Sequence, residues 1–104
     1  MNRKDYNIAR HFKQLVQQRV TPLDVRVFGS RARGDAAPDS DLDVFVVVEH
    51  ATHDIERYVS DCAWEAGFAE DVVIVPVVVG RDRLQGALGE SVFVLNVERE
   101  GIAV

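Results

Sequence analysis

The chain has 104 residues, the length of one domain with one hydrophobic core. Apolar residues make up 47% of it and charged residues 28%, a composition that excludes an intrinsically disordered protein. The net charge of -5 argues against a general nucleic-acid-binding protein, because such proteins need a basic face to displace counterions from phosphates.

The sequence also argues against a membrane protein. The longest apolar run, residues 72–79, is too short to cross a bilayer. The N-terminus leads into an amphipathic stretch and not into the apolar region of a signal peptide. One cysteine, Cys62, allows no internal disulfide and fits a reducing compartment. We therefore expect a cytoplasmic protein.

The first half of the chain predicts a helix and two strands. Apolar residues recur every three or four positions over residues 4–18, which predicts a helix. Alternation predicts a short strand over residues 25–28. Residues 29–40 form a connection rich in Gly, Ser, Asp and Pro. Residues 42–48 are apolar on both faces, which is typical of a central strand covered on two sides.

The second half predicts a helix, a strand and a helical end. Thr52 is the expected N-cap of a helix that stops near Gly67. Residues 72–79 read as a strand, which Pro76 places at a sheet edge or at a bulge. A short helical turn follows over 81–88, and we favour a helix over a strand for 90–100. The order of elements predicts a small α/β sandwich with few strands.

Three side chains on the second predicted helix are interpreted by their spacing. Cys62 lies on the apolar face and is expected in the core. Trp64 and Phe68 are placed in the core in preference to an edge that faces a partner. The three histidines have no metal-ligand spacing and are expected at the surface.

Two aspartates, Asp41 and Asp43, stand two positions apart at the start of the predicted strand 42–48. Alternate strand residues share a face, so both carboxylates point the same way with Cα atoms about 6.6 Å apart. At an effective dielectric near 20, two such charges about 7 Å apart repel by about 2 kcal/mol. A cation relieves this repulsion, and hard oxygen ligands suit Mg²⁺. Asp41 and Asp43 are therefore the candidate catalytic residues and metal ligands.

The connection before this pair has the features of a phosphate cradle. Gly29 lets the backbone approach a ligand closely. If Ser30 opens a helical turn, its amide and hydroxyl face a phosphate. Arg31 and Arg33 add positive charge nearby. The candidate nucleotide-binding residues are Gly29, Ser30, Arg31 and Arg33. Cradle and carboxylates together indicate nucleotidyl transfer, in which a nucleophile attacks an α-phosphate and pyrophosphate leaves.

Other motifs fit the same segment less well. An EF-hand loop that starts at Asp39 has Val44 where glycine is needed and His50 where glutamate is needed. A P-loop has Asp35 in place of its lysine. A polar turn with solvated aspartates remains the simplest alternative, and the combination of Gly-Ser, spacing and paired Asp disfavours it.

The combination resembles a known signature. Gly29-Ser30, ten residues and then Asp41-x-Asp43 are similar to the G-S-x10-D-x-D motif of the DNA polymerase β-like nucleotidyltransferases. Residues 31–35, 38–40 and 96–102 resemble the minimal nucleotidyltransferases (MNT), the antitoxin half of HEPN/MNT toxin–antitoxin pairs.

The resemblance covers most of the chain and implies a fold. It implies one nucleotidyltransferase domain over residues 1–104, of the α/β (α+β) class. Its small mixed three-stranded sheet would be flanked by helices.

The family's complete site has a third carboxylate on the next strand, for which Asp71 is the candidate here. In relatives with a proline in this strand, the acid is expected three residues before it, where Val73 stands. Two alternatives stay open. Either Asp71 is the third catalytic and metal-binding carboxylate, or the site has two carboxylates and binds nucleotide without efficient turnover.

The resemblance also implies a reaction and a partner. We expect Mg²⁺-dependent transfer of AMP from ATP to a tyrosine of a HEPN toxin, which silences the toxin within a hetero-oligomer. A second hypothesis is an antitoxin that neutralises its toxin by binding alone. A nucleotidyltransferase that acts on a small molecule is less favoured, because the short chain leaves no room for an acceptor-binding domain.

Overall fold

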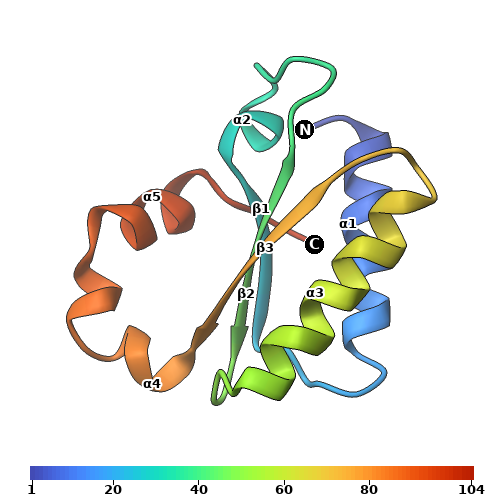
Figure 1. Cartoon of the computed structure of the whole chain (residues 1–104). Coiled ribbons are helices and arrows are strands. Elements are labelled where there is room, and N and C mark those ends of the chain that lie inside the picture. Colours follow the sequence, from blue (N-terminus) through green and yellow to red (C-terminus); the bar gives the residue numbers. More distant parts are fainter.

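Four strands form one mixed sheet with helices on both of its faces (Figure 1). The computed structural model describes residues 1–104. In chain order the elements are α1 (Arg3–Val16), β1 (Asp24–Phe28), α2 (Gly29–Arg33), β2 (Leu42–Val48), α3 (His53–Phe68), β3 (Ile74–Gly80), α4 (Arg81–Leu84), the 3-10 helix η1 (Ala87–Glu90), α5 (Val92–Glu100) and β4 (Ile102–Ala103).

The strand order is β3-β2-β1-β4, with β1 antiparallel to both β2 and β4, and β2 parallel to β3. β2 is therefore an inner strand, and it is buried along nearly its whole length, as its apolar sequence predicts. β3 is an edge strand, which confirms the effect predicted for Pro76.

The sheet has one strand more than the three expected. β4 has only two residues, which pair with β1 as Val27 opposite Ile102 and Arg26 opposite Ala103. Two residues are too few to show the alternation by which a strand is recognised in a sequence. The mixed sheet flanked by helices is otherwise confirmed.

Side-chain caps fix where the longer helices begin. Asn2, Thr52 and Ser91 each accept a hydrogen bond from a backbone N–H three residues further on. Thr52 is the cap predicted for α3, and Ser91 starts the helix favoured for the C-terminal segment. No helix is both long and apolar enough to traverse a bilayer.

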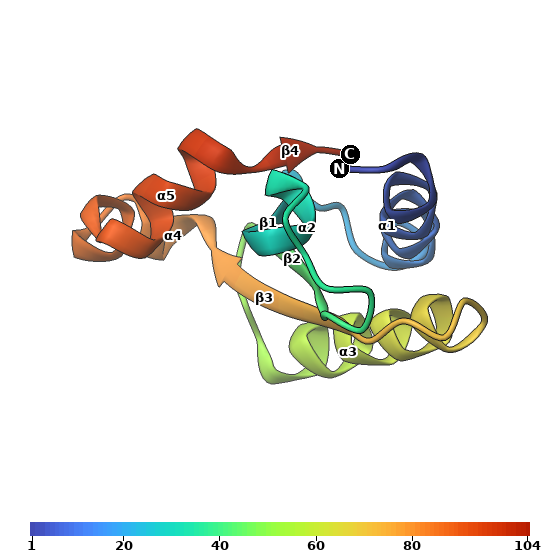
Figure 2. The same ribbon diagram turned by 90° about the horizontal axis from the view of Figure 1, so that it is seen from above.

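The two faces of the sheet carry cores of different size. α1 and α3 lie side by side over one face, where 17 buried residues form the main cluster (Figure 2). On the other face five buried residues form a smaller cluster, with Val94 and Val97 of α5 packed against Phe45 and Val47 of β2 and Val79 of β3. Because alternate residues of β2 point to opposite faces, Asp43 shares its face with this smaller cluster.

The prediction that Trp64 and Phe68 belong to the core is wrong. Their exposed fractions are 68% and 72%, and the two rings stack with centroids 4.8 Å apart. The buried stripe of α3 instead contains Val59, Cys62 and two alanines. Trp64 and Phe68 are one helical turn apart, so they share a face of their own beside that stripe.

Candidate functional site

The turn from β1 into α2 brings backbone against a carboxylate. Gly29 has φ +75°, a conformation that favours glycine. A Cβ atom at this position would lie 2.7 Å from Oδ2 of Asp43, closer than real side chains approach. Phe28 occupies the N-cap position of α2 but makes no side-chain hydrogen bond there. Its side chain therefore leaves the first backbone N–H groups of α2 uncapped. The glycine therefore sets the start of α2 directly beside Asp43.

Asp41 and Asp43 form an uncompensated acidic pair at the start of β2. Asp43 lies opposite Phe28 on one side and Val75 on the other. No ion pair within the chain involves either carboxylate. Burial, and then the negative charge of Asp41, raise the pKa of Asp43 above its ordinary value. A cation at this place would offset both effects.

The raised pKa of Asp43 predicts a stability effect. Folding favours the protonated carboxyl, so its contribution is present at low pH and is lost as pH rises through the folded pKa. At neutral pH without divalent cations, Asp43→Asn should therefore raise the free energy of unfolding. We expect the free energy of unfolding to rise by roughly 1 kcal/mol at low salt. This is about half the Coulomb repulsion of two carboxylates roughly 7 Å apart at an effective dielectric near 20, because solvent screens part of it.

Thermal melts at pH 7.5 and pH 4 measure this effect. The gain in melting temperature should shrink at the lower pH, where Asp43 takes up a proton in the wild type. Asp39→Asn is the matched control, because Asp39 is exposed in the same loop. An equal gain in melting temperature from both variants would show that burial and the charge of Asp41 do not destabilise the ionised Asp43.

Arg31 has a structural position that the sequence did not indicate. Its side chain is only 10% exposed and its Nη1 lies 2.9 Å from Oδ1 of Asp5, which is 5% exposed. The same guanidinium donates hydrogen bonds to the carbonyl oxygens of Pro38 and Ser40. Arg31 therefore ties the loop that precedes Asp41 to α1, and its guanidinium already makes four hydrogen bonds within the chain.

Ser30 and Arg33 lie at opposite ends of α2. Ser30 is half-buried in the first turn, beside Gly29. Arg33 keeps a solvent-exposed side chain, with Asp35 at 3.3 Å and Glu100 at 3.5 Å. Of the two arginines predicted to contact nucleotide, Arg33 is thus the one that a ligand can reach.

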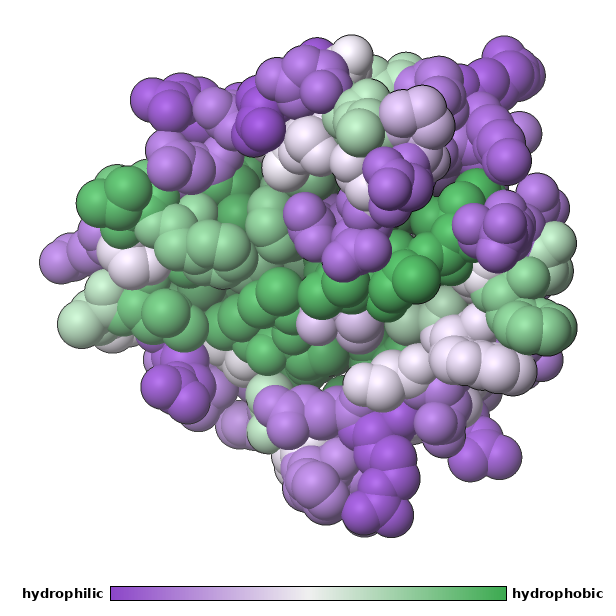
Figure 3. All heavy atoms as spheres, turned by 45° about the horizontal axis from the view of Figure 1, so that its top comes forward, coloured by the Kyte–Doolittle hydropathy of each residue, from purple (hydrophilic) through white to green (hydrophobic).

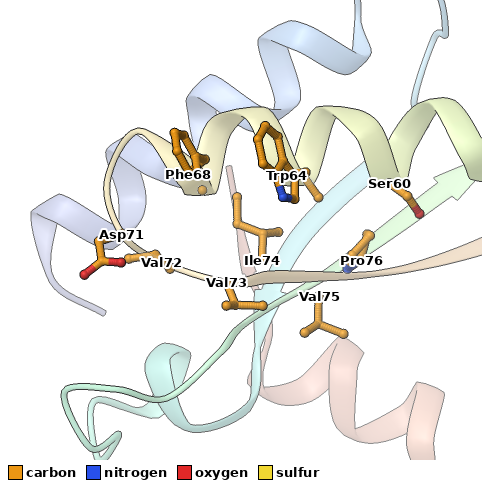
Figure 4. A pocket seen from close by; sticks show the side chains of 11 residues that line it. Ser60, Trp64, Phe68, Asp71, Val72, Val73, Ile74, Val75 and Pro76 are labelled. Carbon is orange, nitrogen blue, oxygen red and sulfur yellow. The ribbon is translucent and has the colours of Figure 1, made fainter.

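Asp71 lies away from the acidic pair. It is an exposed residue with φ 55° in the turn before β3. The positions beside Asp41 and Asp43, in β3 and in the residue just before it, hold valines. Leu42 N–H donates to the Val73 carbonyl, and Asp43 pairs with Val75. Figure 4 shows Val73 between Asp71 and Val75 along the chain.

The chain alone therefore offers two carboxylates at this place. No group of three or more His, Cys, Asp or Glu side chains is arranged to hold a metal ion. Mg²⁺ is commonly bound through one or two carboxylates together with substrate phosphates. Asp41 and Asp43 fit a cation of that kind, bound jointly with a nucleotide.

The sequence matches the nucleotidyltransferase domain family over residues 8–97. The chain belongs to this family. Gly29, Ser30 and the acidic pair all fall within the matched range. No curated protein sequence matches the chain significantly.

A solved structure has the same fold as this nucleotidyltransferase domain. It is a chain from a crystal structure of a toxin–antitoxin with AMP-PNP. The two chains superpose with a TM-score of 0.64 at 20% identity, over 91% of this chain and 70% of that one. The likeness confirms a nucleotidyltransferase fold for the mixed sheet and its helices.

One residue that supports the site was not predicted for this nucleotidyltransferase domain. Asp5 is the most deeply buried charged residue, and it holds the nearly buried guanidinium of Arg31. A signal for it exists in the sequence. Asp5 precedes Ile8, Ala9 and Phe12 at helical spacing, so it lies on the apolar face of α1. A carboxylate on an apolar helix face needs a buried cationic partner.

Proposed function

We propose that this nucleotidyltransferase domain transfers AMP from ATP to a tyrosine hydroxyl of a HEPN-type toxin and so acts as its antitoxin. The observation that carries the transfer is the unpaired Asp41–Asp43 pair beside the start of α2. The shared fold with a chain from a toxin–antitoxin structure that includes AMP-PNP supports the choice of partner and nucleotide.

Each site residue receives a role in this reaction. Asp41 and Asp43 would hold Mg²⁺ together with the triphosphate. When bound, the ion would neutralise phosphate charge that develops during transfer. Gly29 and Ser30 would place the first backbone amides of α2 against the phosphates, and Arg33 would add a cationic side chain at their outer edge.

The reaction joins the acceptor oxygen to the α-phosphorus of ATP as the bond to the bridging oxygen breaks and pyrophosphate leaves. The hydroxyl proton goes to solvent or to a base on the acceptor, since Val73 stands where the resemblance expects a third carboxylate and Val75 lies beside Asp43. In this proposal the chain contributes positioning and charge compensation, which carry most of the catalysis in phosphoryl transfer.

The test is the intact mass of the partner protein after incubation with this chain, ATP and Mg²⁺. We expect added AMP units, and none with the Asp41→Asn/Asp43→Asn double variant. The double variant conserves side-chain volume, so its fold serves as the control and is checked by circular dichroism. A partner of unchanged mass that wild-type chain still binds tightly would refute the transfer.

A second function is favoured by Val73 and Val75, the valines next to the acidic pair. With no third carboxylate there, the chain would neutralise its toxin by occlusion and hold nucleotide without turning it over. In that case the double variant would protect cells from the toxin as well as the wild type does. Loss of protection in the double variant would exclude simple occlusion.

A further inference from the structure

An apolar groove lies between α3 and the edge strand β3, outside the acidic pair. Its volume is about 470 Å³ and most of its lining is hydrophobic. Stacked Trp64 and Phe68 form one wall, whereas Val73 and Val75 stand on the other side of β3 (Figure 4). All four of these large apolar side chains are exposed, Val73 by 63%, and nothing in the chain covers them. Exposed apolar surface of this kind marks interaction sites.

The groove is continuous with the proposed active site. Val75 pairs with Asp43, and the Val73 carbonyl accepts from Leu42 N–H, so both valines share the sheet face of the acidic pair. Figure 3 shows the result as an apolar band across the molecule, bordered by hydrophilic residues above and below. A protein bound along this band would pass directly beside Asp41 and Asp43.

The free edge of β3 does not suit an added strand. Along a strand, the backbone N–H and C=O groups of alternate residues point to opposite sides of the strand. The Val73 carbonyl faces β2, so the backbone groups of Ile74, Pro76 and Val78 face the open edge. Pro76 has no N–H and removes the middle donor from this row. The occupant of the groove therefore binds through side chains, as a helix does, and not through strand pairing.

The charges around the groove identify the chemistry of the occupant. Residues 58–80 contain four acidic residues and no lysine, arginine or histidine. All four are exposed, and they are Asp61, Glu65, Glu70 and Asp71. A second copy of this chain, bound symmetrically, would set these carboxylates against their own counterparts, which is repulsive. Arg19 does not line the groove, and its guanidinium lies over the ring of Tyr58, 5.3 Å from the ring centroid.

We propose that the α3–β3 groove docks the acceptor protein through a helix whose apolar face is flanked by lysines or arginines. The apolar face would cover Trp64, Phe68 and the exposed valines, and the basic flanks would meet the acidic rim. Docking there would bring an acceptor hydroxyl over Asp41 and Asp43. The proposal rests on the proposed function for the identity of its partner, and it concerns binding, which is measured without catalysis.

The test uses the partner that co-purifies with the tagged chain from its own host, then produced separately as a pure protein. Trp64→Ser/Phe68→Ser should weaken its binding at least about 30-fold, since buried aromatic anchors dominate interfaces. Both side chains are exposed, so the fold should be kept, and the melting temperature checks this. Leu23→Ser is the matched control, because Leu23 is 47% exposed and outside the groove.

A charge-reversal variant and a crosslink test the acidic rim and the occupant of the groove. Glu65→Lys/Glu70→Lys should weaken binding at low salt, with a difference that shrinks as salt rises. A photo-crosslinker at position 68 should join a partner segment that contains apolar residues and lysine or arginine.

The outcomes are distinct. Unchanged affinity in the Trp64/Phe68 variant, a crosslink to a second copy of the chain, or no partner that co-purifies would each overturn the docking proposal. Affinity lost in that variant, with no AMP on the partner in the wild type, would support the docking site and refute the transfer. AMP transfer at the wild-type rate by the Trp64/Phe68 variant would leave the function standing and refute the groove.

Discussion

Asp41→Asn should lower the rate of the proposed AMP transfer at least about 10³-fold. The substitution keeps the size of the side chain and removes one of the two negative charges of the proposed metal site. Charge compensation at a transferring phosphoryl group is worth several kcal/mol. A loss of about 4 kcal/mol in the transition state corresponds to this factor. Exposed Asp41 makes no ion pair in the chain, so the fold should be unaffected.

Initial rates with ATP labelled at the α-phosphate measure this prediction. Asp39→Asn, two residues earlier in the same exposed loop, is the control and should stay within about twofold of the wild type. Titration with Mg²⁺ should restore little activity to Asp41→Asn, because an amide is a weak ligand for a hard cation. A rate near that of the wild type would remove Asp41 from the site.

Asp5→Ala should destabilise the fold by about 3–5 kcal/mol, because it leaves the buried guanidinium of Arg31 without its counter-charge. This is a large part of the 5–15 kcal/mol typical of a domain. Arg31→Met should have a similar effect. The double variant should be less destabilised than the sum of the two single variants, since neither charge then stays buried alone.

Urea unfolding of the two single variants and the double variant measures the coupling. Arg33→Met is the matched control, since Arg33 makes only exposed ion pairs and should change stability by about 0.5 kcal/mol or less. Because Arg31 also holds the carbonyl oxygens of Pro38 and Ser40, its loss should free the loop before Asp41 as well. Additive single effects would show that the pair does not act as a unit.

The parts of the site that could be predicted are those governed by local geometry. The period of two along a strand predicts that Asp41 and Asp43 share a face, and in the structure the charge of Asp41 acts on Asp43. The positive φ of Gly29 follows from its place in a tight turn. Pro76 could be assigned to an edge or a bulge because its missing N–H is a local property, and the structure shows the edge. These predictions need no knowledge of which elements meet in space.

The parts that could not be predicted depend on tertiary contacts. The buried ion pair of Arg31 joins residues 26 positions apart, so no local pattern connects them. Exposure of Trp64 and Phe68 follows from where α3 meets the sheet, and both residues have the composition of a core. The neighbours of Asp43 on β3 depend on a parallel register that places Val75 there and Asp71 in a turn.

Pro76 has a further consequence for the chain during synthesis and folding. The segment 72–79 is uncharged and rich in valine, and such segments stack into aggregates when their edges are free. A proline in the middle of the outward-facing row interrupts any ladder that a second chain could build on it. The α3–β3 groove can therefore stay exposed for the proposed partner, while strand pairing between copies of the chain along this edge is hindered.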